Sequence, residues 1–267
     1  MKRSFVVLLS LVMLLGVFMM TSCEEPTAAV VSKAIKNTAA LDSFEAKMTL
    51  NIDMKMGGAD VSVPMIYDIK AKGMQGDEKI IGATAEMEML GVEMLVDIYA
   101  EGEWSYVTVS GEAMGQTYSR SYKQKLNADD AQYDIESDMQ EILKEIPEEL
   151  LEGVKFTDNE DGSKTVSIVI DDEQFKQMYD DIIESTGAQV GADDLSVTIS
   201  NATVSVTVDG GYVKNYEMSY DMTMTVEGVG VTASVTAAIE YSNHNGDVTI
   251  APPANYQSFE DIEEMGF

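Results

Sequence analysis

The segment from Phe44 to Met56 alternates between apolar and polar residues without a break. Every even-numbered position is apolar, and every odd-numbered position is polar or charged. Successive side chains of a β-strand point to opposite faces of a sheet, so this pattern predicts one long strand with a buried face and a solvated face. Such a strand is stable only beside other strands that bury the same face, which constrains the fold of the whole chain.

The same period of two returns along most of the remaining chain. Gly57-Gly58, Leu90-Gly91 and Gly210-Gly211 separate successive runs, as expected for the turns of hairpins. We expect about ten strands in one antiparallel sheet. The further alternating runs are 61–69, 81–89, 92–100, 103–110, 116–123, 154–157, 164–170, 195–208, 212–226, 231–241 and 248–250.

Three segments follow the helical period instead. Residues 28–41, 129–151 and 171–187 each place apolar side chains on one helical face. Asp171, with Gln174 three positions later, is typical of a capping box at the start of the third helix. The sequence therefore predicts an α+β fold: a single large curved antiparallel β-sheet, an incomplete barrel, whose concave side is covered by about three helices. No change in composition marks a domain boundary, so residues 28–267 are expected to form a single domain.

The N-terminus has the layout of an export signal. Lys2 and Arg3 precede an uncharged, mostly apolar run over residues 4–20, which is shorter than the ~20 residues of a membrane-spanning helix. The segment from Met20 to Cys23 resembles the bacterial lipobox, although Met20 stands in place of the usual leucine. The resemblance implies that residues 1–22 are a lipoprotein signal peptide, that Cys23 is acylated with chains such as palmitate, and that residues 23–27 form a lipidated tether. The alternatives are an ordinary signal peptide with a chance cysteine and an uncleaved anchor helix.

Charge and rare residue types exclude several classes of function. The chain has 17 Lys+Arg against 47 Asp+Glu, a net charge of −30, so nucleic acid is not an expected partner. Cys23 is the only cysteine and His244 the only histidine, which excludes a disulfide framework, a cysteine-based zinc site and most histidine-based catalysis. We therefore expect a protein that is not an enzyme and that uses no cofactor or metal ion.

The order of these elements resembles the LolA/LppX-like fold of bacterial lipoprotein carriers. The resemblance covers roughly residues 28–253. It is closest to the uncharacterised methionine-rich lipoproteins of that group, which share the segment from Ala39 to Met48, where the first helix runs into a strand within a few residues. In this fold an incomplete barrel wraps around helices and leaves an apolar cavity, and its members carry or sense lipids, acylated proteins or glycolipids. The resemblance implies a hydrophobic ligand and brings no catalytic residues.

Methionine is frequent at the expected inward positions of the strands. Its side chain is flexible and polarisable and suits surfaces that adapt to varied apolar partners, whereas ordinary cores use stiffer side chains. Three interpretations remain open: plain core filling, a lipid-binding cavity, and copper(I) binding by Met-x-Met pairs. Under the second interpretation we predict ten ligand-binding residues, namely Met48, Leu50, Ile52, Met54, Met65, Tyr67, Met87, Met94, Val96 and Trp104.

Other clusters have simpler explanations. Most of the acidic runs lie on the expected solvent faces of helices, and the run before Gly162 lacks the ligand spacing of a calcium loop. Four aromatic residues between Trp104 and Tyr122 fit a strand edge packed on a helix, the mouth of a cavity or a patch that faces a partner. His244 is expected in a solvent-exposed turn.

Together these features predict an extracytoplasmic lipoprotein, anchored on a bacterial cell membrane, that binds a hydrophobic or lipidated ligand between its sheet and its helices. It would act as a carrier or sensor in the cell envelope, because the chains of the ligand partition from water or the bilayer into an apolar cavity. The alternative is a structural or interaction lipoprotein with a filled core and no ligand. A continuous apolar cavity would favour the carrier, and a filled interior the interaction module.

Overall fold

The computed structural model describes residues 26–126, 154–173 and 196–265, apart from residues 57, 77, 90, 114, 227 and 228. The helices within these residues are α2 (Thr27–Ala39) and two short 3-10 helices, η2 (Tyr256–Ser258) and η3 (Ile262–Met265). The strands are β1 (Ser43–Met56), β2 (Ala59–Lys72), β3 (Ile80–Met89), β4 (Val92–Glu101), β5 (Trp104–Ala113), β6 (Gln116–Lys125), β7 (Thr157–Asp158), β8 (Lys164–Val169), β9 (Ser196–Asp209), β10 (Tyr212–Val226), β11 (Val229–Ser242) and β12 (Glu260–Asp261).

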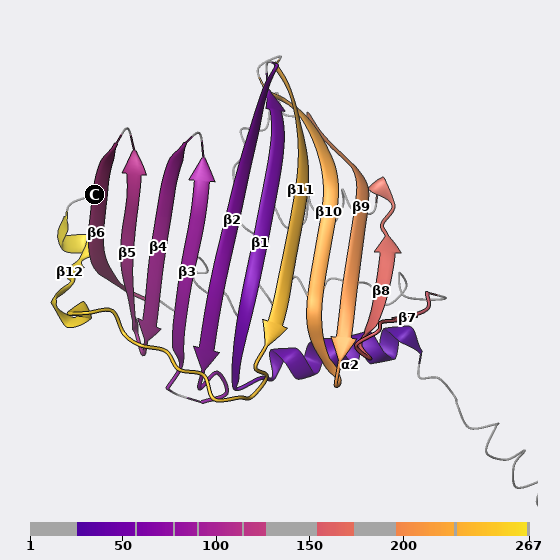
Figure 1. Ribbon diagram of the computed structural model, residues 1–267, viewed down its shortest axis with the longest axis horizontal. Helices are drawn as coiled ribbons and strands as arrows, with labels where there is room; N and C mark the ends of the chain where they lie inside the picture. Colours follow the sequence, from indigo (N-terminus) through magenta and orange to yellow (C-terminus); the bar gives the residue numbers. More distant parts are fainter. Residues whose placement is uncertain are drawn as a thin grey trace, which may run out of the picture.

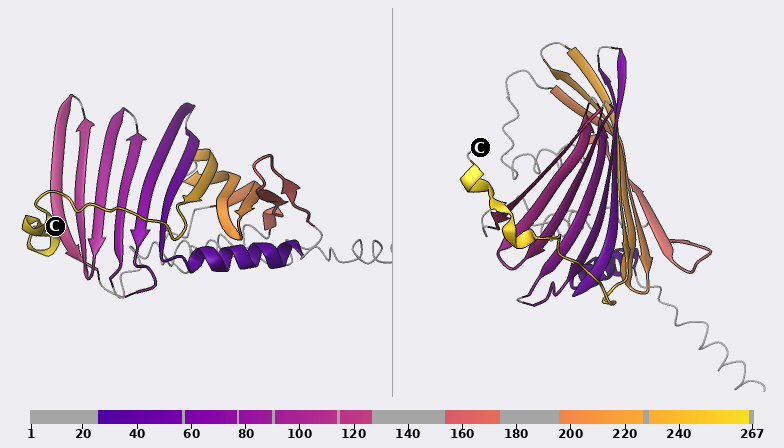
Figure 2. Two further views of the ribbon diagram at one scale, coloured as in Figure 1. Left: turned by 60° about the horizontal axis from the view of Figure 1, so that its bottom comes forward. Right: turned by 60° about the vertical axis from the view of Figure 1, so that its left-hand side comes forward.

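All the described strands belong to one open sheet in the order β12-β6-β5-β4-β3-β2-β1-β11-β10-β9-β8-β7 (Figure 1). Every neighbouring pair is antiparallel except β12 and β6, which run parallel. The sheet is strongly twisted along its length (Figure 2). The prediction of one large, mostly antiparallel sheet is confirmed, with a 12-stranded sheet where we expected about ten strands.

The described helices are fewer than expected. α2 corresponds to the helix predicted at 28–41. The helix predicted at 129–151 lies outside the described residues, and of the one predicted at 171–187 only Asp172 and Glu173 are described as helical. The Glu173 N–H donates to Asp171 Oδ1 at 3.0 Å, so Asp171 caps this segment as predicted. The described part of the chain does not support a cover of about three helices over the sheet.

The alternation within β1 produces two unlike faces. Its even-numbered residues from Phe44 to Met54 are buried or half-buried, whereas the odd-numbered residues from Lys47 to Lys55 are exposed. Directly paired residues of neighbouring strands point to the same face, so the register extends this division across the sheet. We refer to the face that carries the even-numbered residues of β1 and their cross-strand partners as the apolar face, and to the opposite one as the polar face.

The most deeply buried part of the apolar face lies under α2, which crosses the lower ends of β8 to β11 (Figure 1). Val31 and Ala34 of α2 are 0% exposed and belong to one cluster with Val166, Val206 and Val213, which are equally buried. Helical spacing places Val31 and Ala34 on the same side of α2, so the predicted apolar stripe is the side that packs on the sheet.

Polar groups fix α2 to the sheet at one end of this core. The Thr38 hydroxyl accepts a hydrogen bond from the Val213 N–H at 2.9 Å and donates to the Ala34 carbonyl at 2.8 Å. Asn37 Nδ2 donates at 2.8 Å to the carbonyl of Gly211 in the turn between β9 and β10. Gly210 and Gly211 have φ values of 56° and 85°, so this two-residue turn requires glycine.

Thr38→Val should lower the free energy of unfolding by about 1–3 kcal/mol, because it keeps the shape of the side chain and leaves the buried Val213 N–H without this acceptor. Thr49→Val on the exposed side of β1 is the matched control and should change stability by less than about 0.5 kcal/mol. Urea unfolding followed by circular dichroism measures both. Equal unfolding midpoints for Thr38→Val and the wild type would contradict the structural role of this hydroxyl.

Candidate functional site

Cross-strand pairing gathers the methionines of the apolar face into continuous rows. In one row Leu50 pairs with Met65, Met65 with Met87, and Met87 with Met94. In the row beside it Met48 pairs with Tyr67, and the row continues through β3 to Val96. Paired positions in neighbouring strands have Cβ atoms about 5 Å apart, so each row is a strip of touching side chains.

Nine of the ten predicted ligand-binding residues lie on this face. They come from β1, β2, β3 and β4, and every one of them is half-buried: Met48, Leu50, Ile52, Met54, Met65, Tyr67, Met87, Met94 and Val96. The sequence therefore identified residues that the register brings together. Whether they bind a ligand stays a prediction.

Trp104 does not lie with the other nine. It pairs with Glu101 and Lys125, and its neighbour Ser105 is the residue of β5 that pairs with Ala100 on the apolar face. Trp104 is therefore on the polar face, where the Lys123 ammonium lies 4.9 Å from the centroid of its ring. The aromatic character of Trp104 suggested the site, but its position in the alternation of β5 places it on the other side of the sheet.

An aromatic cluster on the polar face was not predicted. The ring of Tyr256, from the C-terminal segment, lies 5.5 Å from that of Tyr99 and 4.7 Å from that of Tyr106, and Phe259 lies 6.3 Å from Tyr106. The segment after β11 reaches this cluster by crossing the strands (Figures 1 and 2). Residues 248–250 of this segment, predicted as a strand, form none in the structure, and the residues after them follow no strand or helix period, so only the structure reveals what the segment covers.

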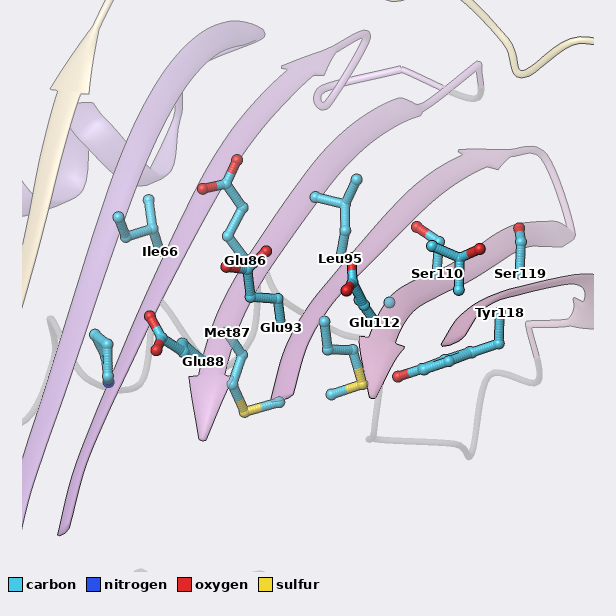
Figure 3. A pocket seen from close by; sticks show the side chains of 14 residues that line it. Ile66, Glu86, Met87, Glu88, Glu93, Leu95, Ser110, Glu112, Tyr118 and Ser119 are labelled. Atoms are coloured by element: carbon cyan, nitrogen blue, oxygen red, sulfur yellow. The ribbon is translucent and has the colours of Figure 1, made fainter. Parts of the chain in front are cut away.

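A depression of about 790 Å³ lies at the upper ends of β2 to β6 and is lined mainly from the polar face. Met87 and Tyr118 lie on the opposite side of the strands from Leu95 (Figure 3). Among the lining residues, Glu88 pairs with Glu93, and Glu93 pairs with Glu112, so three carboxylates stand side by side on the polar face. This depression is not the predicted apolar container, because it is lined mainly from the polar face and four of its lining residues are glutamates.

His244 lies in the turn after β11, as predicted, but it is half-buried where we expected it to be exposed. Its ring stacks on Tyr212 with centroids 5.0 Å apart, and its Nε2 is buried with no hydrogen-bond partner among the described residues. Burial lowers the pKa of His244 below its ordinary value, so the neutral imidazole is favoured.

In the described ranges, no group of three or more His, Cys, Asp and Glu side chains is arranged to hold a metal ion. Across those same ranges, no helix has the length and apolar character needed to cross a membrane.

The aromatic cluster predicts a loss of stability at high pH. Burial, followed by a hydrogen bond with Glu101, raises the pKa of Tyr99 to about 12. The unfolded chain ionises this tyrosine at its ordinary value of 10.0, so the contribution of Tyr99 is intact below pH 10 and is lost as the pH rises toward 12. Tyr99→Phe should therefore make the urea midpoint less dependent on pH in this window. Tyr118→Phe is the control, because Tyr118 is exposed, and its urea midpoint should change with pH as that of the wild type does. The same pH dependence in the wild type and both variants would contradict the role of Tyr99.

Several solved structures are distantly similar to this chain. LprF from Mycobacterium bovis is 15% identical, with 86% of this chain and 97% of that one covered and a TM-score of 0.40. A β-barrel-like DUF1849 protein from Brucella abortus is 10% identical, with 79% and 100% covered and a TM-score of 0.30. A LolA superfamily protein from Nitrosomonas europaea is 9% identical, with 86% and 96% covered and a TM-score of 0.23. These TM-scores are too low to assign a fold or a function.

No curated protein matches this chain. Residues 27–256 match the model of a family described as "Family of unknown function (DUF6612)". Because this match spans most of the sequence, including α2 and β1 to β11, the protein is a member of the DUF6612 family.

Proposed function

We propose that this protein is a lipid-anchored lipoprotein on the extracytoplasmic face of a bacterial cell membrane, and that it binds a hydrophobic or lipidated ligand on its apolar face. It acts as a carrier or sensor of that ligand and catalyses no reaction. Binding is a partition: apolar chains leave water for a wall of methionine, valine and isoleucine, at about 0.8 kcal/mol for each buried CH₂ group.

The continuous apolar rows across β1 to β5 carry this proposal. The methionines of these rows are half-buried, whereas the valines of the core under α2 are almost completely buried. Methionine supplies Met48, Met65, Met87 and Met94 in two adjacent rows, and its flexible thioether adapts to chains of different shape. A wall that only stabilised the fold would favour the stiffer side chains that pack around Val206.

The proposed anchor determines which edge of the sheet stands near the membrane. Cys23 precedes Pro26 by three residues, and three residues of extended chain span at most about 11 Å. α2 begins at Thr27, whose hydroxyl donates to the Val154 carbonyl at 2.7 Å, and this end of α2 lies at the β7–β8 edge (Figure 1). An acylated Cys23 would therefore hold the β7–β8 edge close to the bilayer.

Met65→Gln combined with Met94→Gln should weaken binding of a fluorescent fatty acid about tenfold, because amide groups replace apolar surface that the ligand would cover. The mature lipoprotein, purified from bacterial membranes and placed in phosphatidylcholine nanodiscs, is titrated with the probe, and the signal of empty nanodiscs is subtracted. Mass spectrometry of the same preparation should detect a co-purified lipid beyond those of the nanodisc.

Ile66→Gln combined with Leu95→Gln is the matched control, because these residues adjoin Met65 and Met94 in the sequence, are half-buried and lie on the polar face. The control should bind the probe as the wild type does, and thermal unfolding verifies that both double variants fold. A wild-type protein that binds no apolar probe and carries no lipid would refute the carrier function and favour the interaction module.

A further inference from the structure

Three methionines are consecutive cross-strand neighbours on the apolar face, near the upper ends of β3 and β4 (Figure 1). Met65 of β2 pairs with Met87 of β3, and Met87 pairs with Met94 of β4. No other methionine in the described strands has a methionine as its direct cross-strand partner. We refer to Met65, Met87 and Met94 as the methionine triad.

Strand pairing brings the side chains of the triad closer together than the Met-x-Met pattern of the sequence does. Alternate residues of one strand are about 7 Å apart, whereas the Cβ atoms of paired residues are about 5 Å apart. Each sulfur lies two rotatable bonds beyond its Cβ, so the outer two sulfurs can turn toward that of Met87. The Tyr67 hydroxyl donates to Met65 Sδ at 3.6 Å, which holds this sulfur on the apolar face and leaves its second lone pair for another partner.

A thioether sulfur is a soft and uncharged metal ligand. It suits Cu(I), whereas Ca²⁺ and Mg²⁺ take oxygen ligands and zinc sites use thiolates, imidazoles and carboxylates. Our expectation that the protein uses no metal ion rests on its single cysteine and single histidine, and a thioether site needs neither residue. The triad is therefore a ligand set of a different class from those that the composition excludes.

The depression at the upper ends of β2 to β6 gives an ion access to the triad. Met87 and Met94 line it and are half-buried, and Met87 lies on the same side of the strands as Tyr118 (Figure 3). Gly111 pairs with Met94, and the Tyr118 hydroxyl oxygen lies 2.5 Å from where a side chain on Gly111 would place its Cβ. Because Gly111 has no side chain, Tyr118 lies across β5 and closes the row beside Met94.

Charge around the depression favours a cation. Its lining residues include Glu86, Glu88, Glu93 and Glu112, and the whole chain has a net charge of −30. Carboxylates at this distance attract a cation without coordinating it, since they stand on the polar face. Three uncharged sulfur ligands leave a monovalent ion its positive charge, which these glutamates offset.

We propose that Met65, Met87 and Met94 bind one Cu(I) ion through their three sulfur atoms. This site goes beyond the proposed function, because it requires neither the lipid anchor nor a hydrophobic ligand. The ion is held without a change of oxidation state, and Tyr67 and Tyr118 border the three sulfurs on the same face.

The test uses Ag⁺, which has the charge and the ligand preference of Cu(I) and is stable in air. The mature lipoprotein in phosphatidylcholine nanodiscs is titrated with silver nitrate in chloride-free buffer by isothermal titration calorimetry, and the heat of empty nanodiscs is subtracted. We expect one tight site per chain. Met87→Leu should weaken it about tenfold or more, because leucine keeps the apolar volume and removes the central ligand. Ca²⁺ should not compete, and X-ray absorption of the Cu(I)-loaded protein should show sulfur ligands only.

Met48→Leu is the matched control, because Met48 is a half-buried methionine of the same face whose cross-strand partners are Tyr67 and Ile239. It should bind Ag⁺ as the wild type does. A wild type without a tight site, unchanged affinity in Met87→Leu, or an equal loss in Met48→Leu would overturn the triad. The fluorescent fatty acid should bind Met87→Leu as it binds the wild type, since the wall stays apolar. A protein that binds Ag⁺ and no apolar probe would refute the proposed function and leave the triad standing.

Discussion

The pairing of β1 with β2 on one side and β11 on the other determines both faces of the sheet. Met48 lies between Tyr67 and Ile239 in this arrangement, so a single register defines the apolar face in both halves of the sheet. A shift of β1 by one residue would move Lys47 and Asp53 onto the apolar face, and Met48 and Met54 would then point toward solvent. The partners in β1 and β11 are far apart in sequence, as in the pair of Glu45 and Ser242, and closing so long a loop has an entropic cost that burial along the whole strand must offset.

The two halves of the apolar face use this common register in different ways. Under α2, valines from β8, β9 and β10 are excluded from water and hold the helix to the sheet. From β1 to β4 the same face carries half-buried methionines, namely Met48, Met54, Met65, Met87 and Met94, among buried residues such as Ile69 and Ala83. One half therefore has the stiff side chains that define a single packing, and the other has the adaptable side chains expected of a surface for a variable ligand.

Predictions that rest on strand alternation mostly agree with the structure, although 248–250 is not a strand and the helix predicted at 129–151 lies outside the described residues. Predictions that need tertiary contacts do not agree. Alternation identified the strands and nine of the ten candidate residues, because each side chain's face depends only on its position in the strand. Trp104 was misplaced because its aromatic character was given more weight than its position. Tyr256 was missed because it lies in an irregular segment whose contacts are entirely tertiary.

Most charged residues of the strands lie on the polar face of the sheet, and the buried apolar residues lie on the opposite face. This separation constrains what the protein can bind. A ligand that is only apolar would fit the methionine rows, and a ligand that is only anionic would be repelled by a chain of net charge −30. The proposed ligand would therefore meet the protein on the apolar face of β1 to β4 and leave the glutamates of the opposite face in water.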